Sequence, residues 1–123
     1  MMKSKDHWDS FLHAVEGLWF ALRTQRWAPI CLIAMAVGLG VGWLLGLGYL
    51  ELALLTLAFL GLFVAELFNT ALEATVDLAS PGYHPQAKIA KDVSAAAVFT
   101  MAITVAVVVA ILYIPHLLSW LRA

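Results

Sequence analysis

The chain has 123 residues, of which 63% are hydrophobic and only 12% are charged. Soluble domains are usually about half apolar and about one quarter charged, so this chain has too few polar residues to cover a water-facing surface. Its formal net charge of −1 excludes the basic field that nucleic-acid binding requires. We therefore expect one membrane domain over 1–123.

The first predicted element is an amphipathic helix at 7–26. Apolar residues recur there at helical spacing on one side, and polar residues take the other side. No soluble core remains to receive this helix, so we expect it to lie in the membrane interface. The apolar face consists of Trp8, Phe11, Leu12, Val15, Leu18, Trp19 and Leu22.

Three long apolar stretches follow, at 28–50, 52–79 and 87–114. A spanning helix needs about 20 apolar residues, and the first and third stretches meet this requirement outright. The second meets it if neighbouring helices cover its polar side. Two prolines and a glycine at 80–86 end one helix and begin the next. The predicted fold is all-α, with one interfacial helix and three spans.

Glycine and proline mark two details of these spans. Gly38, Gly42 and Gly46 are spaced by four, which is typical of helices that approach each other closely. We expect the short segment after Pro115 to be an interfacial tail.

The positions of lysine and arginine predict the orientation. All but Arg122 of the seven positive residues lie before the first span or after the second. The positive-inside rule then places the N-terminus and the 80–92 loop in the cytoplasm and the C-terminus outside.

Four polar residues of the second span share one helix face, because Glu66, Asn69, Glu73 and Asp77 are separated by steps of 3, 4 and 4. Ionisable residues in a span are expensive to desolvate and are functional candidates by default. An antiparallel third span would bring Lys88, Lys91 and Asp92 to the level of Glu73 and Asp77. The prediction is a polar patch at the membrane surface, with Glu66 deeper among the lipids.

Such a patch suits a reaction between a soluble anion and a lipid headgroup. Surface carboxylates can hold Mg²⁺, which bridges nucleotide phosphates, and Lys91 can offset phosphate charge. Glu66 can accept a proton from a lipid hydroxyl that attacks the terminal phosphate of ATP. The alternative is structural: Glu66 could be protonated and bonded to another helix, and Lys88 with Asp92 could be a simple i,i+4 pair.

Two sequence motifs, ELFNTALEATVD at 66–77 and HPQAKIAKDVSAAAV at 84–98, resemble the prokaryotic diacylglycerol kinase family, which includes undecaprenol kinases. The resemblance covers nearly the whole chain. It implies a lipid kinase of the bacterial inner membrane that uses ATP and Mg²⁺ and forms homotrimers with shared active sites. By resemblance, Glu66 is the general base and Glu73 is a metal ligand. The implied nucleotide site consists of Asn69, Glu73, Asp77, Tyr83, His84, Lys91 and Asp92.

One position departs from the family pattern. The family usually has a glutamate, a second metal ligand, at the end of the first helix, where this chain has Gln25. The amide oxygen can coordinate a metal but brings no negative charge, so a weakened family member is one alternative. The pair Asn69-Thr70 and the run at 84–92 look more like undecaprenol kinases than diacylglycerol kinases, and we expect undecaprenol as the acceptor, with diacylglycerol as the alternative.

Two non-enzymatic hypotheses compete with the kinase. A small oligomeric transporter or channel subunit would place its ionisable residue near the bilayer midplane, accessible from both sides. An assembly or anchor protein would give Glu66, Glu73 and Asp77 no reason to share a face. Nucleotide binding distinguishes the kinase from both.

Overall fold

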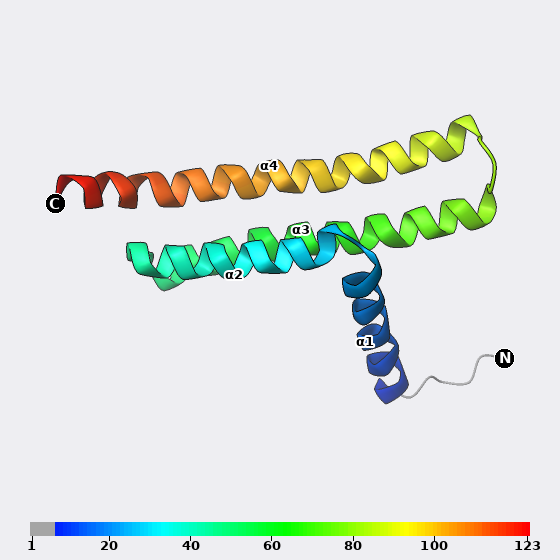
Figure 1. Ribbon diagram of the computed structural model, residues 1–123, viewed down its shortest axis with the longest axis horizontal. Helices are drawn as coiled ribbons and strands as arrows, with labels where there is room; N and C mark the ends of the chain where they lie inside the picture. The colour runs from blue at the N-terminus through cyan, green and yellow to red at the C-terminus, as the bar shows by residue number, and fades with distance from the viewer. Residues whose placement is uncertain (1–6) are drawn as a thin grey trace.

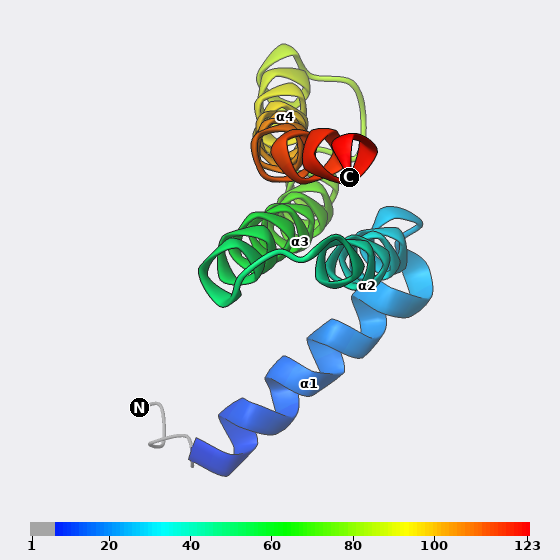
Figure 2. The same ribbon diagram turned by 90° about the vertical axis from the view of Figure 1, so that its left-hand side faces the viewer.

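The computed structural model describes residues 7–123, which form four helices (Figure 1). α3 and α4 run antiparallel and side by side, α2 packs against α3, and α1 leaves the bundle at a steep angle (Figures 1 and 2). Three of the helices are long and apolar enough to cross a membrane. The all-helical prediction with three spans is confirmed. The helices are α1 (His7–Thr24), α2 (Trp27–Leu45), α3 (Tyr49–Ala79) and α4 (Pro85–Arg122).

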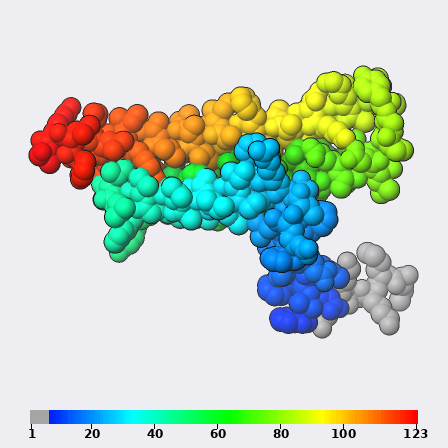
Figure 3. All heavy atoms as spheres, in the orientation of Figure 1, coloured from blue at the N-terminus to red at the C-terminus, as the bar shows by residue number. Residues whose placement is uncertain are grey.

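α1 forms where the sequence predicts it, but it has little contact with the rest of the chain. Ala21 is its one buried residue, and Figure 3 shows the helix projecting from the bundle. Both the apolar and the polar sides of α1 are exposed in the single chain, so its interfacial position stays a prediction. At its end, Ala21 packs with Ala28 and Cys31 of α2 and with Phe63 of α3. This small cluster fixes where α1 joins the bundle.

The main core lies between α2, α3 and α4 in the half of the bundle that contains the α2–α3 turn. We call this half, residues 38–63 and 101–116, the packed end. Leu55 has no exposed surface there, and Phe59 and Val105 are buried beside it. The Tyr113 hydroxyl of α4 donates a hydrogen bond to the backbone carbonyl of Gly38 in α2. A second side-chain bond, 2.9 Å between His116 Nε2 of α4 and a Glu51 carboxylate oxygen of α3, lies at the same end. Apolar contact and these two bonds hold the three helices together.

The glycines of α2 serve two different purposes. A methyl group at Gly38 would lie 3.1 Å from the Phe59 ring, and one at Gly42 would lie 3.2 Å from Leu47, so both positions allow the close approach that the spacing predicts. Gly46 instead adopts a left-handed φ of 90° and ends the helix. The span therefore stops at Leu45, before the predicted limit at 50, because glycine enters the left-handed region at little cost.

α4 is longer than predicted. It begins at Pro85 and continues through Pro115 to Arg122, where the sequence suggested an interfacial tail. Proline removes one backbone N–H, but in spanning helices neighbouring groups compensate and the helix continues. Both α3, at 31 residues, and α4, at 38 residues, exceed a hydrocarbon layer of about 30 Å.

Candidate active site

The polar stripe of α3 runs from buried to exposed toward the α3–α4 loop. Glu66 is only 6% exposed, Asn69 and Glu73 are partly buried, and Asp77 is exposed. The four side chains share one face because their spacing follows the helical repeat. We call residues 66–92 the polar end of the bundle. It lies at the opposite end of the bundle from the packed end.

Glu66 is the deepest of these groups. It follows the buried Phe63, and its backbone carbonyl accepts a 2.9 Å hydrogen bond from the Thr70 hydroxyl. Within residues 7–123 its carboxylate forms no hydrogen bond to another helix. A carboxylate that is buried but uncommitted is available to accept a proton from a bound hydroxyl.

Asn69 and Glu73 interact directly. The Asn69 side-chain Nδ2 donates to Glu73 Oε1 over 3.4 Å, which is a weak hydrogen bond. The Asn69 Oδ1 atom is buried and has no hydrogen-bond partner among the described residues. Buried polar atoms are normally paired, so this oxygen requires a donor or a cation that the single chain does not provide.

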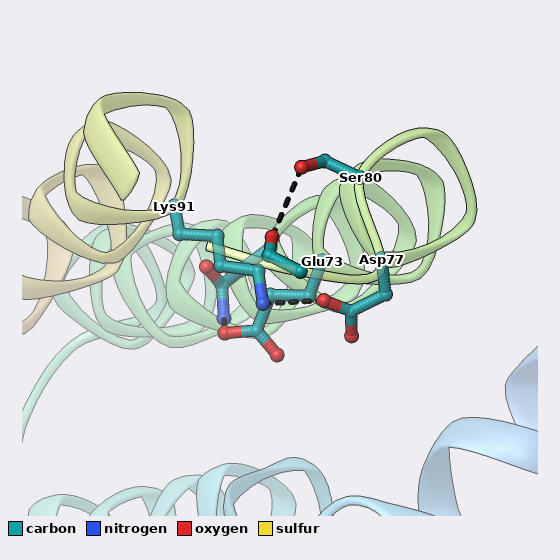
Figure 4. Close-up of polar contacts among 6 residues, drawn as sticks. Glu73, Asp77, Ser80 and Lys91 are labelled. Carbon is teal, nitrogen blue, oxygen red and sulfur yellow. Dashed lines mark hydrogen bonds and ion pairs between the residues drawn. The ribbon is translucent and has the colours of Figure 1, made fainter. Parts of the chain in front are cut away.

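Two lysines of α4 face the same end. Lys91 forms an ion pair with Asp77 of α3, while Lys88 pairs with Asp92 one turn along α4 at 2.5 Å. Figure 4 shows the Lys91 side chain reaching across from α4 to Asp77, with Glu73 beside it. The antiparallel register predicted for the two helices is thereby confirmed. The Lys88–Asp92 contact is the simple i,i+4 pair that the structural alternative proposed.

A cleft of about 350 Å³ opens where α3 ends and α4 begins. His84 caps the N-terminus of α4, because its ring Nδ1 atom accepts a 3.1 Å hydrogen bond from the backbone N–H of Gln86. Lys88, a member of the predicted polar patch, also lines the cleft, as does Ser80, which sequence reasoning did not select. The turn pattern at 80–86 is the sequence feature from which Ser80 could have been identified. The complete lining is Val76, Ser80, Gly82, Tyr83, His84, Ala87, Lys88, Lys91 and Asp92.

Gln25 lies in the short connection between α1 and α2. Its side-chain Nε2 donates to the Thr24 hydroxyl over 3.1 Å, and within residues 7–123 no hydrogen bond joins Gln25 to Glu73. In residues 7–123, no three His, Cys, Asp or Glu side chains gather closely enough to hold a metal ion. Within one chain, the candidate oxygen ligands at the polar end are the Glu73 carboxylate and the unpaired Asn69 Oδ1.

An apolar groove of about 560 Å³ separates α1 from α3 and runs beside Thr70. Thr70 follows Glu66 by one helical turn and bonds to its backbone carbonyl, so the groove passes about one turn from Glu66 along α3. Its remaining lining is Ala14, Gly17, Leu18, Phe20, Ala21, Leu67, Ala71 and Ala74.

Comparison with known proteins identifies similar chains. The sequence model of the prokaryotic diacylglycerol kinase family matches residues 12–113. The undecaprenol kinase of Bacillus subtilis (strain 168) is 37% identical over 123 residues, which cover 94% of this chain and 100% of that protein. A diacylglycerol kinase of Synechocystis sp. is 40% identical over 111 residues, which cover 89% of this chain and 63% of that protein.

Proposed function

Because the chain belongs to the prokaryotic diacylglycerol kinase family, we propose that it transfers the terminal phosphate of ATP to undecaprenol, with diacylglycerol as the alternative acceptor. It is an integral membrane lipid kinase. One observation carries the proposal: the buried Glu66 carboxylate lies on the same helix face as the charged groups of the polar end. A lipid hydroxyl and a water-soluble phosphate can meet there.

In the proposed reaction, Glu66 accepts the proton of the lipid hydroxyl. The hydroxyl oxygen then forms a bond to the terminal phosphorus of ATP, and the bond between that phosphorus and the ADP oxygen breaks. Positioning and charge neutralisation dominate the catalysis of phosphoryl transfer. Lys91 would contact the phosphates in place of part of its contact with the Asp77 carboxylate. Tyr83, His84 and Asp92 would line the rest of the nucleotide cleft.

The donor set at the polar end fits Mg²⁺. This ion prefers oxygen ligands and is commonly held by one or two carboxylates together with substrate phosphates. Glu73 would supply the carboxylate and Asn69 Oδ1 the unpaired amide oxygen. When bound, Mg²⁺ neutralises phosphate charge. Gln25 is proposed as a further ligand, through its side-chain carbonyl oxygen.

We also propose a homotrimer with shared active sites, since a ligand from another subunit would complete the sparse donor set. The proposed orientation puts the polar end and the N-terminus in the cytoplasm of a bacterium, where ATP is available, and the C-terminus outside. No feature of residues 7–123 favours the transporter or anchor hypothesis over the kinase.

The test is phosphate transfer from labelled ATP in detergent micelles, with undecaprenol and diacylglycerol offered separately. We expect labelled lipid with both, and a higher kcat/KM with undecaprenol. A higher value with diacylglycerol would reverse the acceptor assignment. Absence of product with either lipid, from folded protein with ample Mg²⁺, would contradict the proposal.

The role of Gln25 has its own test. In Gln25→Glu, an added negative charge at the metal should lower the Mg²⁺ concentration that gives the half-maximal rate. The matched control is Gln86→Glu, which adds the same charge outside the proposed ligand set. An unchanged Mg²⁺ requirement in Gln25→Glu would remove Gln25 from the metal site.

A further inference from the structure

The junction of α1 and α2 concentrates arginine and tryptophan. We call residues 23–27 together with Trp19 the α1–α2 corner. The Arg23 guanidinium lies over the Trp19 ring, with 5.7 Å between its central carbon and the ring centroid. Arg26 lies over Trp27 in the same way at 5.8 Å. Both tryptophans are more than half exposed, and both arginines are exposed as well.

The corner arginines differ from the lysines of the polar end. Lys88 and Lys91 both pair with carboxylates, whereas no ion pair within residues 7–123 involves Arg23 or Arg26. The positive end of the α2 dipole adds to their charge. α2 has no acidic residue in its first turn and no side-chain cap to offset it. The corner is therefore a positive surface with no internal counter-charge.

The position of the corner along the bundle indicates its depth in the membrane. Ala21 and Ala28, on either side of it, pack against Phe63, one turn from Glu66 on α3. The corner thus lies near the level of Glu66, between the apolar packed end and the charged polar end. Exposed tryptophan and arginine near the end of a span are typical of a membrane–water interface, and the long arginine side chains can reach it from a slightly deeper position.

The occupant must satisfy two requirements: an anion for the guanidinium groups and an apolar body beside the indole rings. We propose that the α1–α2 corner binds the headgroup phosphate of an anionic phospholipid, with Arg23 and Arg26 as the ligands. Guanidinium groups match phosphate oxygens in a forked, two-bond geometry. Since α1 buries only Ala21 against the protein, contact with this lipid holds α1 in place. The bound lipid therefore sets the width of the groove between α1 and α3.

The experiment measures lipid binding without ATP or acceptor, so its result is independent of the proposed kinase reaction. The chain has five tryptophans. Replacing Trp8, Trp43 and Trp120 by Phe leaves Trp19 and Trp27 as reporters. This protein is placed in vesicles that contain brominated phosphatidylglycerol or brominated phosphatidylcholine, and fluorescence quenching gives the relative binding constant of the two lipids at the corner.

We expect the reporter protein to prefer phosphatidylglycerol, by about fivefold for each arginine. Arg23→Gln with Arg26→Gln should reduce the preference to about one, whereas replacement of both by Lys should retain most of it. The matched control is Lys3→Gln with Lys5→Gln, which removes two positive charges from the same part of the chain and should leave the preference intact.

Three outcomes would overturn the proposal. Equal quenching by both lipids in the reporter protein would mean that the tryptophans anchor the corner in the membrane without a preference for an anionic headgroup. An equal loss in the Lys3 and Lys5 control would show attraction by net charge rather than a site. In a separate titration, displacement of the lipid by added ATP would assign the arginines to nucleotide phosphates. Should the glutamine variant fail to insert, salt provides the same test, because raising it from about 0.05 to 1 M should abolish the preference of the reporter protein.

Discussion

The two ends of the α2–α4 bundle are built from different interactions. At the packed end, Leu55 has no exposed surface, and Tyr113 of α4 bonds to α2. At the polar end, the contact between α3 and α4 is an ion pair between Lys91 and Asp77, and α2 no longer takes part. Apolar packing holds the helices in place, and the polar end uses that support to expose charged groups that contribute little to folding. Stability and chemistry should therefore respond to different substitutions along the same helix.

The largest difference between the effect on activity and the effect on stability is expected at Glu66. Glu66→Gln should reduce phosphate transfer by a factor of about 10²–10⁴, since the amide cannot accept the proton of the lipid hydroxyl. Transfer of labelled phosphate to undecaprenol measures the effect, and circular dichroism checks the fold. Glu51→Gln makes the same change on α3 at the opposite end and should keep the activity. Equal rates in wild type and Glu66→Gln would remove the proposed base.

Leu55 tests the opposite half of the comparison. Leu55→Ala should lower the free energy of unfolding by about 2 kcal/mol, because the packing lost in the core is not regained. Unfolding in mixed detergent measures the loss, and activity well below the melting temperature should remain near that of wild type. Leu57→Ala removes the same atoms from an exposed position on α3 and should have little effect. A selective loss of activity in Leu55→Ala would show that the two ends are coupled.

Lys91 probes the charge at the polar end. Lys91→Gln should raise the KM for Mg-ATP about tenfold, since a charged contact to phosphate is lost. The melting temperature should not change, because the ion pair with Asp77 is exposed. Arg122→Gln is the control, since it removes one positive charge from the opposite end of α4. An equal rise in both variants would indicate attraction by overall charge instead of a contact.

The smallest expected effect concerns Tyr113. Tyr113→Phe removes the hydrogen bond to the Gly38 carbonyl and should cost about 0.6 kcal/mol of stability, the usual value for a bond between spanning helices. Thermal unfolding in detergent detects this shift, and the kinetic constants should stay unchanged. Tyr49→Phe makes the same change at an exposed ring and should be silent. A loss of activity in Tyr113→Phe would mean that the packed end positions the site.

The sequence was sufficient for features that depend on local spacing. The common face of Glu66 and Asp77 follows from the helical repeat, and the contact between Asp77 and Lys91 follows from two antiparallel helices joined by a short loop. Helix ends were harder to predict from the sequence. Gly46 and Pro115 each permit a helix either to end or to continue, and only tertiary context decides between the two. In one case the helix ended, and in the other it continued.

Long-range contacts gave no sequence signal. The bond between Tyr113 and Gly38 joins residues 75 positions apart, and no periodicity predicts it. The location of Gln25 likewise depends on the angle at which α1 leaves the bundle, and this angle is set by the few contacts around Ala21. The roles of the site residues stay predictions until the variants above are measured.

The tight turn at Gly46 has a practical consequence for anyone who studies this protein in cells. Between Leu45 and Tyr49 the chain offers only three residues to the compartment on that side of the membrane. A protease, an antibody or a labelling reagent added there would find almost nothing to cut or bind. An epitope for mapping topology on that face therefore belongs after Ala123, where it extends a helix end and leaves the turn intact.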